Sequence, residues 1–149
     1  PAQEARWHDV GVDSVWRRYF EVWCQAASCT DMPFTCMAHP DLVKKFGYRP
    51  SFNPQPLYDE AAEAVQSSGR MVEVNTSGLT YACAELFPAP DLLRTFCRAG
   101  IPCSIGTDAH DPAVVDCNLM PGLAAMYEAG YRCVTVPTST GDRRQIALE

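Results

Sequence analysis

Asp108 and His110 are the two residues whose type and spacing most clearly indicate chemistry. They follow Gly106 and an apolar run at residues 102–105, which favours a strand. In an extended segment, residues two apart point the same way, so both side chains can aim at one point just past the end of the strand. A carboxylate and an imidazole that converge there suit Zn, Mn or Fe. The alternative is an ordinary loop in which Asp108 caps the next helix.

The composition is typical of a globular domain. The chain has 149 residues, of which 47% are hydrophobic and 20% charged, enough for one domain with its own core. The net charge of -6 argues against a general binder of the nucleic-acid backbone, which would be basic. The 8 cysteines include no Cys-x-x-Cys pair, which favours reduced thiols and a cytoplasmic protein. No apolar run approaches the length of a membrane span.

The rest of the chain alternates between predicted helices and predicted strands. Helical spacing occurs at residues 15–27, 57–68, 90–99 and 121–129, and short apolar runs occur at 33–38, 71–75, 102–105 and 133–136. This alternation favours an α/β fold with parallel strands and outer helices. In the first helix, an aromatic stripe that includes Trp16, Tyr19 and Trp23 predicts core or interface packing.

Polar residues follow three of these four strands. His39 follows the first strand, residues 75–77 (Asn-Thr-Ser) end the second, and Asp108 and His110 follow the third. In parallel α/β folds, active sites lie at the carboxyl ends of the strands. We therefore expect these polar groups to lie at one edge of the sheet.

Four longer motifs occur in the order and spacing of a known enzyme family. They are residues 38–50 (Ala-His-Pro-Asp-Leu-Val-Lys-Lys-Phe-Gly-Tyr-Arg-Pro), 73–79 (Glu-Val-Asn-Thr-Ser-Gly-Leu), 85–90 (Glu-Leu-Phe-Pro-Ala-Pro) and 106–110 (Gly-Thr-Asp-Ala-His). The first resembles the third histidine motif of the PHP (polymerase and histidinol phosphatase) phosphoesterases, and the last resembles their terminal Asp-x-His motif. Within that family, the likeness is greatest to the monofunctional histidinol-phosphate phosphatases.

The resemblance implies a fold and a metal centre. The family fold is a distorted (β/α)7 barrel, of which residues 1–149 would form a C-terminal part with about four β/α units. Up to three divalent ions, Zn, Mn or Fe, would lie at the carboxyl ends of the strands. The resemblance implies that His39, Asp108 and His110 are ligands, and that Asp108 and His110 also serve in catalysis.

The resemblance also implies a reaction, the metal-dependent hydrolysis of L-histidinol phosphate to histidinol and phosphate. The residues that it suggests for substrate binding are Arg49, Asn75, Thr76 and Ser77. Other PHP domains act on other phosphoesters or nucleotides, and a nucleic-acid substrate is disfavoured by the acidic charge. A catalytically silent binding or structural subunit is the alternative from outside the enzymes.

Two features depart from the family pattern. The N-terminal half, which begins with a His-x-His strand, has no counterpart here, since His8 does not stand in that form. A partial barrel exposes strand edges, so we expect a partner: the missing half or a second copy of the chain. Thr80 and Tyr81 stand where relatives often carry a basic pair, which leaves the substrate open.

Four residues near these motifs have a structural interpretation beside the functional one. Glu73 is interpreted as an interior carboxylate rather than a ligand. Lys44 and Lys45 are predicted to form a solvated helix start rather than a phosphate clamp. Asn75 either orients a ligand or caps the end of its strand.

Overall fold

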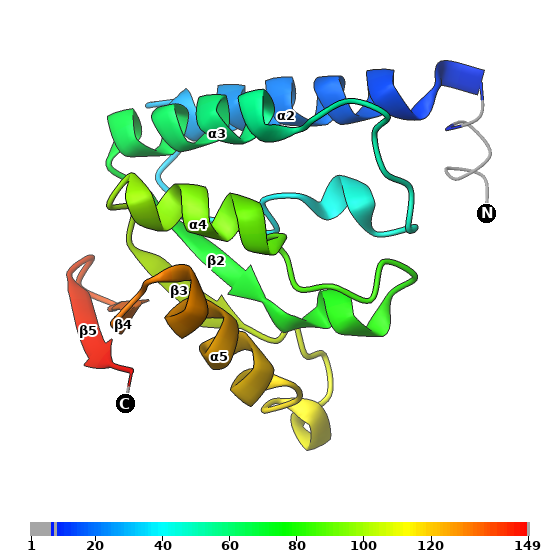
Figure 1. The fold of residues 1–149 in the computed structure, drawn as a ribbon. Coiled ribbons are helices and arrows are strands. Elements are labelled where there is room, and N and C mark those ends of the chain that lie inside the picture. The colour runs from blue at the N-terminus through cyan, green and yellow to red at the C-terminus, as the bar shows by residue number, and fades with distance from the viewer. Residues whose placement is uncertain (1–6, 8, 149) are drawn as a thin grey trace.

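The computed structural model describes residue 7 and residues 9–148, so the prediction for His8 lies outside the described residues (Figure 1). Its longer elements are α2 (Val12–Ser28), β1 (Cys36–Met37), α3 (Gln55–Ser68), β2 (Met71–Asn75), α4 (Pro90–Arg98), β3 (Cys103–Gly106), α5 (Leu119–Ala129), β4 (Cys133–Pro137) and β5 (Arg143–Ala147). Three 3-10 turns, η1 (Leu42–Lys44), η2 (Thr76–Thr80) and η3 (Pro112–Val114), follow β1, β2 and β3.

Strands β1, β2 and β3 form a parallel sheet in that order. Cys36 of β1 lies opposite Met71 of β2, and β2 continues along β3 until Asn75 lies opposite Gly106. The register brings the carboxyl ends of β2 and β3 to the same edge. The predicted α/β fold with parallel strands and flanking helices is confirmed at this level.

The helices form a layer over the sheet. Helix α2 packs against α3, α3 against α4 and α4 against α5, and Figure 1 shows α2 and α3 side by side. The buried residues of α2 are Trp16, Phe20, Trp23 and Ala27, spaced four, three and four apart. This spacing places them on one face of the helix, where they join the core.

Strand β1 is shorter than the strand predicted at residues 33–38. Pro33 has no backbone N–H to donate, and the carbonyl of Phe34 accepts from the Arg70 guanidinium at 3.2 Å instead of from a neighbouring strand. The same guanidinium donates to the carbonyl of Ala27 near the end of α2. Arg70 is only 8% exposed, so it caps α2 from within the fold and ends the pairing of β1.

The last predicted strand forms, but it does not join the parallel sheet. Strand β4 pairs antiparallel with β5 as a separate hairpin. Its turn is closed by the Thr138 amide, which donates to the carbonyl of Asp142 at 2.9 Å, and Gly141 supplies a φ of 87°. The expectation of a fourth parallel strand was wrong: within the described residues, β4 pairs with the tail after residue 137 and forms no ladder with β3.

The cysteines differ in burial: Cys103 is buried, Cys117 is exposed and the other six are partly buried. All eight lie in the described part of the chain and are free thiols. Burial raises the pKa of Cys24 to about 11 and that of Cys36 to about 12, so these thiols remain protonated and unreactive near neutral pH. Among the described residues, no helix is both long enough and apolar enough to cross a membrane.

Candidate functional site

The carboxyl ends of β2 and β3 border a cavity of about 450 Å³. Its walls come from the η2 loop and from the segment between β3 and α5. The lining includes Thr76, Ser77, Tyr81, Asp108 and His110. The prediction that polar groups collect at this edge of the sheet therefore agrees with the geometry of the described residues.

His39 and Asp108 approach each other from the two outer strands of the sheet. The distance between His39 Nε2 and Asp108 Oδ2 is 3.5 Å, and the side chains are 25% and 38% exposed. Both residues have left-handed backbones, with φ of 45° and 54°. Non-glycine residues rarely adopt this region, and such strain is common at functional sites.

The His39–Asp108 pair fits a metal ion in donor type and spacing. Two ligands that each lie about 2.1 Å from a tetrahedral Zn²⁺ are roughly 3.4 Å apart, close to the observed 3.5 Å. Within residues 7 and 9–148, however, no three His, Cys, Asp or Glu side chains lie close enough to hold an ion. The pair can therefore supply two ligands, and water or further groups would have to complete the coordination.

His110 is held by the backbone of the same loop. Its Nδ1 lies 2.8 Å from the carbonyl oxygen of Asp108. When Nδ1 carries the proton and donates to that carbonyl, Nε2 keeps its lone pair for a metal or a proton. His110 is exposed and lines the cavity, so the structure places it beside the His39–Asp108 pair without adding it to a three-residue cluster.

Asn75 caps the end of β2. Its Oδ1 accepts from the backbone N–H and the hydroxyl of Ser77, at 3.0 Å and 2.6 Å. Its amide nitrogen donates to Glu73 Oε2 at 3.2 Å, and the residue is 1% exposed. Of the two roles predicted for Asn75, the structure shows the capping role.

The other residues of this loop differ in what they can offer. Thr76 donates its hydroxyl to the carbonyl of Cys117 at 2.9 Å, which ties the loop to the segment before α5. Ser77 is only partly buried and lines the cavity. Ser77 is therefore better placed than Thr76 to contact a substrate.

Glu73 packs across the adjacent strand. A Cβ at Gly106 would lie 2.4 Å from Glu73 Oε1, so a larger residue at that position would have to displace the carboxylate. Glu73 is partly buried and is held by the Asn75 amide. Its place beside the η2 loop agrees with an interior carboxylate that supports the site.

Lys44 and Arg49 belong to a charge cluster behind the site. Lys44 Nζ lies 2.8 Å from Asp41 Oδ2 and 3.2 Å from Glu85 Oε2, while Arg49 Nη2 lies 2.9 Å from Glu85 Oε1. Lys44 is 1% exposed and Asp41 fully buried. The expected solvated position of Lys44 was therefore wrong, because the buried Asp41 three residues earlier holds its ammonium. Arg49 is not one of the described residues that line the cavity.

The surroundings of this cluster shift the pKa values of two carboxyl groups, Asp41 and Glu85, in opposite directions. Burial raises the pKa of Asp41, and the Lys44 ammonium and the backbone N–H of Ala89 offset only part of that rise. For Glu85, burial by itself would raise the pKa, but the positive charges of Lys44 and Arg49 outweigh that effect and lower it. The cluster joins η1 to the segment before α4.

Tyr19 on α2 contacts the turn that carries His39. Its hydroxyl donates to the His39 carbonyl at 2.7 Å and accepts from the Leu42 amide, whose nitrogen is 3.2 Å away. Burial and the negative charge of Asp41 raise the pKa of Tyr19, so the hydroxyl keeps its proton at neutral pH. In the sequence, Tyr19 stands out only as part of an aromatic stripe, since nothing in its spacing indicates a hydrogen bond to a residue 20 positions away.

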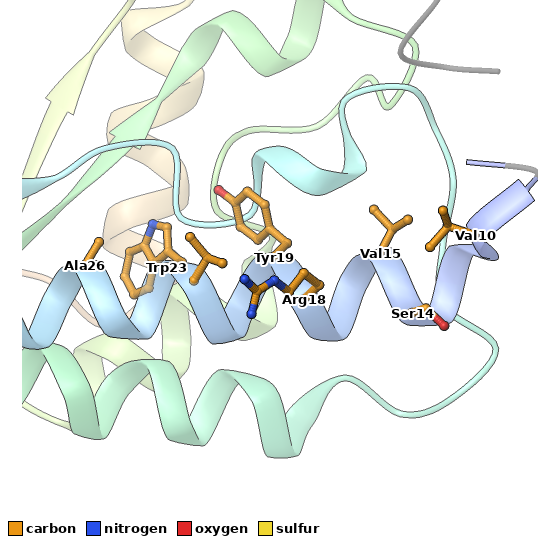
Figure 2. Close-up of a pocket in the computed structure, with 8 residues that line it drawn as sticks. Val10, Ser14, Val15, Arg18, Tyr19, Trp23 and Ala26 are labelled. Atoms are coloured by element: carbon orange, nitrogen blue, oxygen red, sulfur yellow. The ribbon is translucent and has the colours of Figure 1, made fainter. Parts of the chain in front are cut away.

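A second cavity, of about 530 Å³, lies along the exposed face of α2 and is almost entirely apolar (Figure 2). Its walls include Val15, Tyr19, Val22 and Trp23. Val22 is 45% exposed. Tyr19 borders this groove and also contacts the His39 turn, so the two regions meet at one residue.

Comparison with known proteins relates the chain to one enzyme. No family model matches it. A protein of Deinococcus radiodurans named "Probable histidinol-phosphatase" is 37% identical over 103 residues, which are 68% of this chain and 38% of that protein. The chain thus spans well under half the length of this curated relative. Over those 103 residues the predicted resemblance is confirmed, and the chain is a partial homologue of this probable histidinol-phosphatase.

Proposed function

We propose that this chain forms part of a metal-dependent phosphatase that hydrolyses L-histidinol phosphate to histidinol and phosphate. The observation that supports it most directly is the 3.5 Å approach of His39 Nε2 to Asp108 Oδ2 at the carboxyl edge of a parallel sheet. The name of the Deinococcus radiodurans relative suggests the substrate. The proposal includes a PHP-type barrel, of which the three parallel strands would be a part.

The site residues divide the chemistry among themselves. A divalent Zn, Mn or Fe ion, when bound, supplies positive charge against the phosphoryl oxygens. His39 and Asp108 would hold that ion, and the Nε2 of His110 could give or take a proton. Ser77 lines the cavity, and its hydroxyl, which now donates to Asn75 Oδ1, would donate to a phosphoryl oxygen only on release from that bond. Arg49 takes part in substrate binding only if it leaves Glu85, to which it is now paired.

The cavity suits a small phosphorylated metabolite. Its volume of about 450 Å³ lies within the usual range of small-molecule sites. Tyr81 lines it in place of a basic side chain, so most of the positive charge for the phosphate would come from the metal. A nucleic acid is disfavoured by the net charge of -6.

The proposed metal site needs ligands beyond the His39–Asp108 pair. We expect these from the other half of the barrel or from a second copy of the chain. With two protein ligands, the described part of the chain would hold one or two ions weakly. A site completed by a partner would bind the metal tightly and would turn over substrate.

The test measures Zn²⁺ and Mn²⁺ binding by the full chain, and phosphate release from L-histidinol phosphate by the chain together with the partner that completes its site. Because each variant alters a ligand, His39→Ala and Asp108→Asn should weaken metal binding by more than the roughly 10–100-fold that loss of an outer-shell partner costs. Chelation should abolish phosphate release by the completed site until metal is restored. Asp59→Asn is the control, because this residue is exposed on α3 and accepts a hydrogen bond from Gln55 of the same helix. Unchanged metal affinity in both site variants would contradict the ligand assignment. Release of phosphate only from other phosphomonoesters would contradict the substrate.

A further inference from the structure

We propose that Tyr19 positions His39, and that its hydroxyl thereby sets the affinity of the His39–Asp108 pair for a divalent cation. The inference rests on the proposed function, because it takes that pair as a metal site. Tyr19 acts through the His39 backbone, to which its hydroxyl is bound. It is therefore a positioning residue and not a ligand.

The hydroxyl bridges the two ends of a tight turn. It donates to the carbonyl of His39 at 2.7 Å and accepts from the amide of Leu42 at 3.2 Å. The same amide lies 3.2 Å from the His39 carbonyl, which closes residues 39–42 as a turn. One side chain from another element thus satisfies both polar groups that define the width of the turn.

The turn matters because it holds His39 in a backbone conformation that is unfavourable for a non-glycine residue. The φ of 45° is left-handed, and non-glycine residues stay in this region only when their surroundings hold them there. The backbone angle sets the direction in which the imidazole leaves the chain. A turn that relaxed toward negative φ would turn Nε2 away from Asp108.

Helix α2 is a rigid support for this contact. Tyr19 packs edge-on against Phe20, with ring centroids 5.6 Å apart, and Phe20 is 1% exposed. One turn further along α2, the indole N–H of Trp23 donates to the carbonyl of Ala38 at 3.4 Å. Figure 2 shows both side chains on the same side of the helix. Two hydrogen bonds from one helix therefore hold two consecutive residues after β1.

Tyr131 offers a matched control elsewhere in the fold. Its hydroxyl donates to the carbonyl of Ile101 at 3.0 Å, and the residue is 8% exposed. Like Tyr19, it donates its hydroxyl to a backbone carbonyl next to a strand. That strand is β3, and the carbonyl is far in sequence from the turn that carries His39. Tyr131→Phe therefore removes the same kind of hydrogen bond without touching that turn.

The experiment compares Tyr19→Phe with Tyr131→Phe in the full chain. Mn²⁺ affinity should fall about tenfold or more in Tyr19→Phe and stay unchanged in Tyr131→Phe, although both variants should lower the urea midpoint. The NMR coupling between the amide and Hα protons of His39 should change only in Tyr19→Phe. Equal Mn²⁺ affinity in Tyr19→Phe and the wild type, or an equal loss in both variants, would overturn the inference.

The coupling measurement separates this inference from the proposed function. If His39→Ala leaves Mn²⁺ binding unchanged, the pair is not a metal site and the proposed function fails at that point. The His39 coupling then still decides whether Tyr19 holds the left-handed turn. An unchanged coupling in Tyr19→Phe overturns the positioning role whatever metal binding shows.

Discussion

Lys44 and Lys45 are adjacent in sequence, but their side chains differ in burial and in the partners of their charges. The Lys44 ammonium is buried between Asp41 and Glu85, whereas Lys45 is only partly buried and lies 4.0 Å from the ring centroid of Tyr81. A buried charge that loses its partner is costly, while a partly exposed cation over a ring contributes little. The two neighbours therefore allow a direct comparison of a buried charge with a partly exposed one.

Lys44→Ala should lower the free energy of unfolding by about 3–5 kcal/mol, because it leaves the Asp41 carboxylate buried without its ammonium. Lys45→Ala, the matched control, should cost about 1 kcal/mol or less. Urea denaturation at neutral pH measures both. Equal losses in the two variants would show that the Asp41–Lys44 pair is not buried in solution.

At the level of elements, η2 is fitted tightly against the segment that follows it. A Cβ at Gly78 would lie 1.9 Å from the backbone carbonyl oxygen of Glu85 and 3.1 Å from the Phe87 ring. At Gly106 the nearest atom, Glu73 Oε1 at 2.4 Å, is the end of a flexible side chain. The backbone at Glu85 cannot move as easily as that carboxylate can.

Gly78→Ala should therefore destabilise the fold by about 3 kcal/mol or more, and Gly106→Ala by about 1 kcal/mol, since overpacking costs most where backbone must shift. Both values come from urea denaturation of the full chain. Gly106→Ala should also displace Glu73 from Asn75, which holds it at 3.2 Å. A Gly106→Ala variant that loses more stability than Gly78→Ala would be inconsistent with this packing.

For the whole molecule, the charge cluster links stability to pH. Because the pKa of Asp41 is raised in the fold, the folded state binds this proton more readily than the unfolded state. The contribution of Asp41 to stability therefore decreases as the pH rises through its unfolded value of 3.8 toward its folded value. Glu85, whose pKa is lowered, contributes in the opposite sense, and its stabilisation is lost as the pH falls from its unfolded pKa of 4.5 through its lower folded pKa.

The Lys44→Ala variant should show the Asp41 effect most clearly. Without Lys44, the pKa of Asp41 rises further, so protonation relieves the buried charge at a higher pH. The stability difference between Lys44→Ala and the wild type should shrink as the pH is lowered from about 7 to about 4–5. Urea denaturation across that range measures it. A difference that grew on acidification would mean that Asp41 does not carry the unpaired charge.

Much of the fold could be predicted because its signals are local. The spacing of Trp16, Phe20 and Trp23 along one face indicates a helix at any position in the chain. Alternation of such helices with short apolar runs indicates parallel strands. The polar groups of the site could be predicted for the same reason, since His39, Asn75 and Asp108 each stand at the end of an apolar run.

By itself, the sequence determined the α/β alternation, the edge of the sheet where polar groups collect, and the kinship with histidinol-phosphatase. The tertiary structure decided the antiparallel pairing of β4, the burial of Lys44 and the hydrogen bond from Tyr19 to His39. These three depend on contacts between segments, and periodicity along one segment carries no information about which group another segment will present. For that reason, the positions of the polar groups along the chain could be predicted, whereas the side chains that hold them in place could not.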